Sequence, residues 1–160
     1  MTSLVNMGRQ VGELLKERGE TVAVSESAAG GLISASLLSV SGASAYYLGG
    51  ASVYTRSARR GLLRFGDTKV KMRGSTEEYA LLTASTMREI VGADWAVGES
   101  GAAGPSGNRY GDPAGYAAIA VSGPVTATCV IQTGDSDREA NMWEFCKAAL
   151  NLLYETVSEN

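Results

Sequence analysis

The stretch Thr21-Val22-Ala23-Val24-Ser25-Glu26-Ser27-Ala28-Ala29-Gly30-Gly31 decides the fold class of this chain. Its first residues are apolar or β-branched, which predicts a short buried strand over 21–25. Small residues and a glycine pair then predict a tight turn, and the apolar residues that follow predict a helix over 31–40. A strand that leads through a glycine turn into a helix is typical of α/β proteins, which bind ligands at this point.

The start of the helix predicted over 31–40 is a candidate anion site. Backbone N–H groups at a helix N-terminus are free and the helix dipole is positive there, so phosphate groups bind readily. Glu26 and Ser27 are expected at the carboxyl end of the strand, facing the same crevice. A tight strand-to-helix turn without a ligand explains the same residues, and the stretch alone leaves both interpretations open.

Helix and strand signals alternate on both sides of this stretch. Helices are predicted over 3–18 and 56–64, and from capping boxes at 75–78 and 136–139 to about residues 91 and 157. Further strands are predicted over 51–54, 94–98, 115–121 and 125–131, the last two as a hairpin. Loops are expected over 65–75 and 99–113, and a helical turn over 45–48. We predict one domain over residues 1–160, with an α/β fold that forms a three-layer α/β/α sandwich around a mixed sheet of about five strands.

The bulk composition excludes several classes of protein. The chain has 160 residues, of which 44% are hydrophobic, enough for one domain with a real core. Its net charge of −3 argues against a nucleic-acid partner, which needs a basic surface. No apolar run approaches the ~20 residues of a membrane span, and the amphipathic N-terminus is no secretory signal, so we expect a cytoplasmic location without membrane contact. Cys129 and Cys146 are expected to be buried free thiols.

The absence of histidine limits the possible chemistry. It excludes Ser-His-Asp and Cys-His mechanisms and histidine-ligated zinc, so a catalytic serine needs a lysine, a tyrosine, a carboxylate or water as its base. The glycines of Gly98-x-x-Gly101-x-x-Gly104 do not have dinucleotide-binding spacing, and no phosphate-binding P-loop motif is present. We therefore expect a site that requires neither a metal nor a cofactor.

Three predicted loops converge at the edge of the sheet where the parallel strands end. They cover residues 25–31, residues 41–50 leading to Tyr54, and residues 99–113. Two short basic clusters, at 56–64 and 69–73, are explained by a solvated surface or by a small ligand that bears a phosphate.

Four blocks of sequence, in order and in register, resemble the CinA C-terminal domain of the competence/damage-inducible protein family. Residues 24–31 (VSESAAGG) resemble its signature ESCTGG, and residues 42–47 (GASAYY) resemble GSSAWF. Residues 53–59 (VYTRSAR) resemble TYSNEAK, and residues 100–105 (SGAAGP) resemble TGIAGP, while Gly134-Asp135 resembles GDR. Active family members are nicotinamide mononucleotide deamidases. The resemblance covers nearly the whole chain and implies hydrolysis of nicotinamide mononucleotide to nicotinate mononucleotide and ammonia.

The resemblance also implies roles for individual residues. Ser44 matches the family's serine nucleophile, Tyr54 matches the tyrosine that assists proton transfer, and Arg59 falls on the activating lysine. In the family, two glycine-bearing loops hold the ribose phosphate and the oxyanion. The positions that match this binding site are Ser27, Gly30, Gly31, Ser100, Gly101 and Gly104, with Arg138 two residues beyond the family's arginine. Glu26 either orients the pocket or holds the turn together.

Three departures from the family pattern affect this site. Arg59 replaces a lysine, and a guanidinium stays charged and cannot take a proton from serine. Ala28-Ala29 replace Cys-Thr, and Asp112 lies where the family has a positive charge. General-base assistance contributes roughly 10²–10⁴-fold in rate, so loss of the lysine leaves open a pocket that binds with little deamidation.

Three functions remain open from the sequence. The first is a nicotinamide-nucleotide amidase, and the second is an inactive paralogue that binds a nucleotide-like small molecule. The third is an assembly module that forms homo-oligomers through the apolar stripe of the last helix, which core burial explains equally well. Structural roles also compete, because Ser44 fits a helix cap, Tyr54 a core aromatic, and Arg59 a surface residue paired with a carboxylate.

Overall fold

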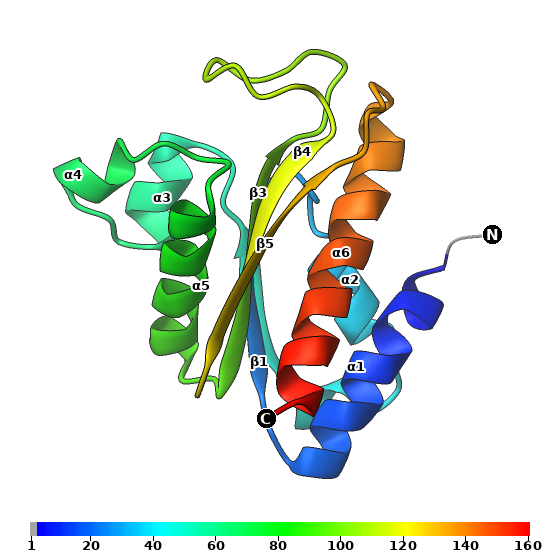
Figure 1. Ribbon diagram of the computed structural model, residues 1–160. Helices are drawn as coiled ribbons and strands as arrows, with labels where there is room; N and C mark the ends of the chain where they lie inside the picture. The colour runs from blue at the N-terminus through cyan, green and yellow to red at the C-terminus, as the bar shows by residue number, and fades with distance from the viewer. Residues whose placement is uncertain (1–2) are drawn as a thin grey trace.

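The computed structural model describes residues 3–160, so Met1 and Thr2 of the predicted domain lie outside the described residues. Figure 1 shows a twisted central sheet with helices on both faces. The strands are β1 (Val22–Glu26), β2 (Tyr47–Ser52), β3 (Trp95–Ala102), β4 (Tyr116–Ser122) and β5 (Thr126–Gln132). The helices are α1 (Leu4–Arg18), α2 (Leu32–Leu38), α3 (Arg56–Leu62), α4 (Asp67–Val70), α5 (Glu77–Val91) and α6 (Arg138–Ser158), with a 3-10 helix at Ala43–Ala45.

The sheet has the strand order β2-β1-β3-β4-β5. Strand β1 pairs in parallel with β2 and β3, whereas β4 runs antiparallel to both β3 and β5. All five residues of β1 are buried, as expected for a strand covered on both faces. The predicted α/β/α sandwich with a mixed sheet of five strands is confirmed.

Each face of the sheet has its own layer of helices and its own apolar core. Figure 1 shows α1, α2 and α6 on one face and α3, α4 and α5 on the other. The first core contains Trp95 and Ile119 of the sheet and Phe145 of α6, and the second contains Phe65 and Met87. The apolar stripe of α6 packs in the first core, so core burial accounts for it.

Short polar side chains cap the helices as the sequence predicts, with small shifts in position. Thr55 caps α3 by accepting from the N–H of Ala58 at 3.1 Å, which confirms its predicted role. Thr76 caps α5 and Asp137 caps α6, each one residue after the first residue of its predicted capping box. For α5 the reason is that Ser75 has a positive φ of 55°, whereas Thr76 has the extended conformation that a cap needs.

The predicted boundaries are wrong by more than two residues in three places. Strand β2 begins at Tyr47, and the helical turn predicted over 45–48 lies earlier, at Ala43–Ala45. Gly50 belongs to β2, where it pairs with Val24 of β1, and glycine is required there because a Cβ would lie 2.5 Å from the Val24 carbonyl oxygen. Strand β3 continues four residues into the predicted loop, since its pairing with β4 extends to Ala102. Helix α4 lies inside the loop predicted over 65–75.

Both cysteines are free, as predicted. Cys146 is buried in α6, whereas Cys129 in β5 is only half-buried. Burial raises the pKa of the Cys146 thiol to about 12, so this group stays protonated and unreactive. Among residues 3–160, no helix is long and apolar enough to cross a bilayer.

Candidate functional site at the carboxyl edge of the sheet

The parallel strands β1, β2 and β3 end at the same edge of the sheet, which we call the carboxyl edge. Residues 27–31, 53–55 and 103–115 leave the sheet there, and α6 begins at the same end of the molecule (Figure 1). This is the position at which α/β sheets bind ligands. Two of the three predicted loops, 25–31 and 99–113, therefore meet as expected.

Glu26 ends β1 with a side chain that is only 1% exposed. Its carboxylate accepts hydrogen bonds from the backbone N–H groups of Gly31 at 2.9 Å, Ile33 at 3.1 Å and Ser34 at 3.0 Å. These amides have no hydrogen-bond acceptor within α2 because they lie in its first turn. The carboxylate of Glu26 supplies the acceptor, and its negative charge complements the helix dipole. Of the two predicted roles for Glu26, the structure supports the one that holds the turn together.

Glu99 holds the preceding part of the same turn. It lies in β3, is 1% exposed, and accepts hydrogen bonds through Oε2 from the N–H groups of Ser27 and Ala29, both at 2.9 Å. Its Oε1 is buried without a hydrogen-bond partner among the described residues. Burial raises the pKa of Glu99 to about 7, against the lowering effect of these two hydrogen bonds.

These two carboxylates correct the expectation that the amides of the turn are free to bind an anion. The amides are already hydrogen-bonded to Glu26 and Glu99, and a phosphate at this position would meet two buried carboxyl groups. Within residues 3–160, no group of three or more His, Cys, Asp or Glu side chains is placed to hold a metal ion. One feature of the sequence indicates that Glu99 is buried, because its carboxylate lies among small and apolar residues. The prediction of a loop over residues 99–113 does not include this role.

The glycine pair of the turn has a conformational role. Gly30 and Gly31 have φ values of 67° and 103°, which other residues rarely adopt. A Cβ on Gly30 would lie 2.7 Å from the terminal methyl group of Met142 in α6. The pair therefore turns the chain into α2 and lets the turn pack closely against α6.

Three predicted site residues meet at the rim of the carboxyl edge. Arg138 of α6 donates through Nη2 to the hydroxyl of Tyr54 at 3.0 Å and through Nη1 to the carbonyl oxygen of Gly104 at 2.6 Å. The Tyr54 side chain is 59% exposed, so the core role considered for it from the sequence is wrong. A Cβ on Gly104 would lie 2.7 Å from the carbonyl oxygen of Ser136, so this glycine lets the loop after β3 approach α6.

Arg59 lies on the other face of the sheet, on α3. Its guanidinium stacks 4.2 Å from the ring centroid of Tyr79, and Nη1 donates to the carbonyl oxygens of Val70 at 3.1 Å and Met72 at 2.6 Å. The pairing with a carboxylate considered for Arg59 is absent, since this residue forms no ion pair within residues 3–160. The guanidinium is fixed in place and carries no group that accepts a proton.

Ser100 and Gly101 have different positions in β3. The hydroxyl of Ser100 accepts a hydrogen bond from the N–H of Ser75 at 3.0 Å, on the side of the sheet where α5 packs. A Cβ on Gly101 would lie 2.7 Å from both the Cβ of Ala117 and the carbonyl oxygen of Tyr116 in β4. Strand packing therefore explains Gly101, whereas Ser100 contributes a polar side chain close to the carboxyl edge.

Ser44 lies at the opposite end of the sheet. It is exposed within the 3-10 helix Ala43–Ala45, just before β2, whose Tyr47 pairs with Val22 at the start of β1. Tyr54 follows the far end of β2, where Ser52 pairs with Glu26. The expectation that residues 41–50 converge with the other two loops is therefore wrong, because β2 separates Ser44 from Tyr54.

Hydrogen bonds and an ion pair connect the loop after β3 to the segment before α5. Arg73 donates through Nη2 to both carboxylate oxygens of Asp112, each at 2.8 Å. Asn108 donates to Asp112 at 2.8 Å and to the hydroxyl of Ser75 at 3.3 Å. The acidic residue that departs from the family pattern thus has a basic partner, and the pair holds the loop over the α5 side of the carboxyl edge.

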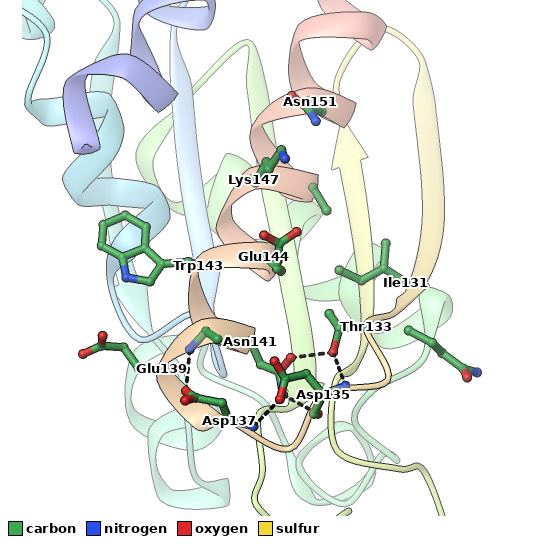
Figure 2. Close-up of a pocket in the computed structure, with 13 residues that line it drawn as sticks. Ile131, Thr133, Asp135, Asp137, Glu139, Asn141, Trp143, Glu144, Lys147 and Asn151 are labelled. Atoms are coloured by element: carbon green, nitrogen blue, oxygen red, sulfur yellow. Dashed lines mark hydrogen bonds between the residues drawn. The ribbon is translucent and has the colours of Figure 1, made fainter. Parts of the chain in front are cut away.

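A groove with a volume of 870 Å³ lies elsewhere, between β5 and α6. Figure 2 shows Trp143, Glu144 and Lys147 along the helix, with Ile131 in the strand and Thr133 just after its end. At one end of the groove, the hydroxyl of Thr133 donates to Asn141 Oδ1 at 2.5 Å. These two polar groups are therefore paired with each other within the protein. No residue that we predicted for the site lines this groove.

The chain is an α/β/α sandwich with polar residues gathered at the carboxyl edge of its parallel strands, which is where proteins of this class commonly bind ligands. Residues 5–157 match the family model of the CinA C-terminal domain. The chain therefore belongs to the CinA family, as the sequence resemblance predicts.

The similarity extends to sequences and to solved structures. A CinA-like protein of Prochlorococcus marinus (strain MIT 9312) is 38% identical over 117 residues, which cover 71% of this chain and 28% of the relative. A CinA-like protein of Chlorobium phaeobacteroides is 32% identical over 164 residues, which cover 99% of this chain and 39% of the relative. The chain thus spans well under half the length of these two relatives.

Among solved structures, a CinA superfamily protein of Klebsiella pneumoniae superposes with a TM-score of 0.90 at 25% identity, covering 99% of this chain and 100% of that one. The competence/damage-inducible protein CihA of Agrobacterium tumefaciens has a TM-score of 0.87 at 25% identity, with 99% of each chain covered. These superpositions agree with the five-stranded sheet and helix layers described above.

Proposed function

We propose that the chain binds nicotinamide mononucleotide or a close analogue at the carboxyl edge and hydrolyses its carboxamide only slowly. The observation that supports this proposal is the contact of Arg138 with Tyr54 and Gly104. These residues come from three separate segments, and the family resemblance implies a catalytic role for Tyr54 and substrate-binding roles for Gly104 and Arg138. Membership of the CinA family supports the class of ligand.

Slow hydrolysis follows from the groups that the carboxyl edge lacks. In the reaction, an oxygen nucleophile adds to the carbonyl carbon, the C–N bond breaks, and ammonia leaves with a transferred proton. Arg59 occupies the position of the family's lysine and cannot accept that proton. Ser44 lies at the opposite end of the sheet. Since a general base contributes roughly 10²–10⁴-fold, its loss predicts binding with little turnover.

Incubation of the purified protein with nicotinamide mononucleotide tests this proposal. We expect saturable binding by calorimetry and ammonia release at least about 100-fold slower than that of a CinA protein that retains the lysine. Arg59→Lys is expected to increase ammonia release, because a lysine amine can lose its proton. Turnover as fast as in the lysine-bearing protein would refute slow hydrolysis. If the protein shows neither binding nor turnover, the assembly module becomes the better explanation.

Ser44→Ala is expected to change neither nucleotide affinity nor any residual ammonia release by more than about twofold, because the residue is exposed and far from the carboxyl edge. Tyr54→Phe serves as the comparison. It removes the acceptor for Arg138 and is expected to weaken binding about 2–10-fold. Loss of turnover in a well-folded Ser44→Ala protein would show that this serine takes part in the reaction.

A further inference from the structure

A nucleotide needs donors for its anionic groups, and the turn before α2 does not supply them. The amides of Ser27, Ala29 and Gly31 are hydrogen-bonded to buried carboxylates. Any phosphate or carboxylate group of a ligand must therefore find its donors elsewhere at the carboxyl edge. The opposite face of the sheet, where α3 and α5 pack, carries such donors.

Arg59 presents its second guanidinium nitrogen, Nη2, on that face. Its Nη1 is held by the carbonyl oxygens of Val70 and Met72, and its plane is held by the ring of Tyr79. Among residues 3–160, both hydrogen bonds from the guanidinium to carbonyl oxygens use Nη1, and the other side chain that contacts it is Tyr79, so Nη2 makes no carbonyl contact. A guanidinium that is anchored on one side with donors left on the other is preorganised to bind an oxyanion.

The hydroxyl of Ser100 lies beside the same patch. A Cβ on Gly74 would lie 3.2 Å from Arg59 Nη2 and also 3.2 Å from Ser100 Oγ, so these two atoms flank one small area of backbone. Because Ser100 Oγ accepts its hydrogen bond from Ser75, its own proton is left to donate. Two donors, one from α3 and one from β3, therefore border the same position.

The surroundings of this patch are positively charged. Arg73 is paired with Asp112, whereas Arg59 and Arg109 form no ion pair within residues 3–160. Tyr110 lies beside them and accepts a hydrogen bond from Arg109 at 2.9 Å. Although burial alone raises the pKa of Tyr110, the hydrogen bond and charge of Arg109 and the charge of Arg59 lower it overall. The charges of Arg109 and Arg59 thus make the potential at this position more positive.

We propose that Arg59 Nη2 and Ser100 Oγ form an anion subsite that receives a phosphate or carboxylate group of a small ligand. Arg59 then acts as a binding residue at the position where the family has its lysine. The subsite itself does not depend on the proposed function. Only the identification of its ligand as a pyridine nucleotide rests on that function.

The first experiment uses inorganic phosphate as the probe and measures thermal unfolding at constant ionic strength. Arg59→Gln removes the guanidinium, and Arg60→Gln is the matched control, because Arg60 lies on the same helix, is exposed, and pairs with Asp67. Phosphate is expected to raise the Tm of the wild type and of Arg60→Gln but not of Arg59→Gln. An equal shift in all three proteins, or no shift in the wild type, would overturn the subsite.

A second variant keeps the test decisive if Arg59→Gln unfolds. Gly74→Ala leaves both donors in the chain and places a methyl group 3.2 Å from each of them. Gly74 is outside the set of glycines with a positive φ, so alanine is compatible with its backbone. This variant is expected to lose the phosphate response while its Tm without phosphate stays close to that of the wild type. A full phosphate response in a folded Gly74→Ala protein would count against the subsite.

Calorimetry with two nucleotides identifies the anionic group. Nicotinamide mononucleotide carries only the phosphate, and nicotinate mononucleotide carries both phosphate and carboxylate. In Arg59→Gln, we expect about tenfold or greater loss of affinity for both if the phosphate is bound, or for the acid alone if the carboxylate is bound. Unchanged affinity for both would overturn the proposal. A phosphate response that depends on Arg59 without binding of either nucleotide would refute the proposed function and retain the subsite.

Discussion

Replacing Glu26 by alanine is expected to lower the free energy of unfolding by about 3 kcal/mol or more. The substitution removes a buried carboxylate and leaves the amides of Gly31, Ile33 and Ser34 without their acceptor. A hydrogen bond to a charged group contributes about 1.5–3 kcal/mol, and a buried donor that loses its partner pays a comparable desolvation penalty. Urea unfolding followed by circular dichroism measures the loss.

Two further variants make this result interpretable. Glu26→Gln keeps one side-chain oxygen as an acceptor, so we expect a smaller loss than for alanine. Glu17→Ala makes the same change at an exposed position of α1 and is expected to stay within about 0.5 kcal/mol of the wild type. A Glu26→Ala protein as stable as Glu17→Ala would show that the carboxylate does not hold the start of α2.

Glu99 is expected to make the protein less stable as the pH rises from about 4.5 to about 7. Its pKa is about 7 in the folded chain and 4.5 without the influence of the fold, so the folded state retains a proton in this interval that the unfolded state has lost. Stability falls with pH wherever the folded state binds more protons. Each pKa unit corresponds to about 1.4 kcal/mol, so the full effect is about 3 kcal/mol.

Glu99→Gln tests this pH dependence. The amide oxygen can still accept from Ser27 and Ala29, and its NH2 group replaces the buried Oε1 that has no partner. We expect the variant to gain stability over the wild type progressively above about pH 4.5, with the largest gain above about pH 7. Urea unfolding at several pH values measures this difference, with Glu89→Gln on the exposed side of α5 as the control. Parallel stability curves for wild type and Glu99→Gln would contradict the prediction.

The sequence predicts the fold well because most of its elements have strong local signals. The apolar run of β1, the stripe of α6 and the cap at Thr55 are all readable without tertiary information. Strand β2 is the exception. Its paired glycines have the composition of a turn, yet Gly50 is required by the close approach of β1, a contact between strands far apart in sequence.

The site is predicted less completely, because a resemblance identifies residues without placing them. The meeting of Tyr54, Gly104 and Arg138 agrees with the grouping that the motifs imply. Ser44 belongs to the same set of motifs, but the extended strand Tyr47–Ser52 carries it to the other end of the sheet. The role of Glu99 depends on its hydrogen bonds to a turn far away in the sequence, so the small and apolar residues around it indicate burial but not its partners.

The position of β1 between β2 and β3 also constrains how the chain acquires its structure on the ribosome. Strand β1 and its neighbour β2 are synthesised early, but the partner on the other side of β1 begins only at Trp95. Until β3 emerges from the exit tunnel, Val22 and Val24 have an open strand edge beside them and no complete core around them. A nascent chain that stops before Trp95 therefore exposes an unpaired strand edge that other chains can pair with.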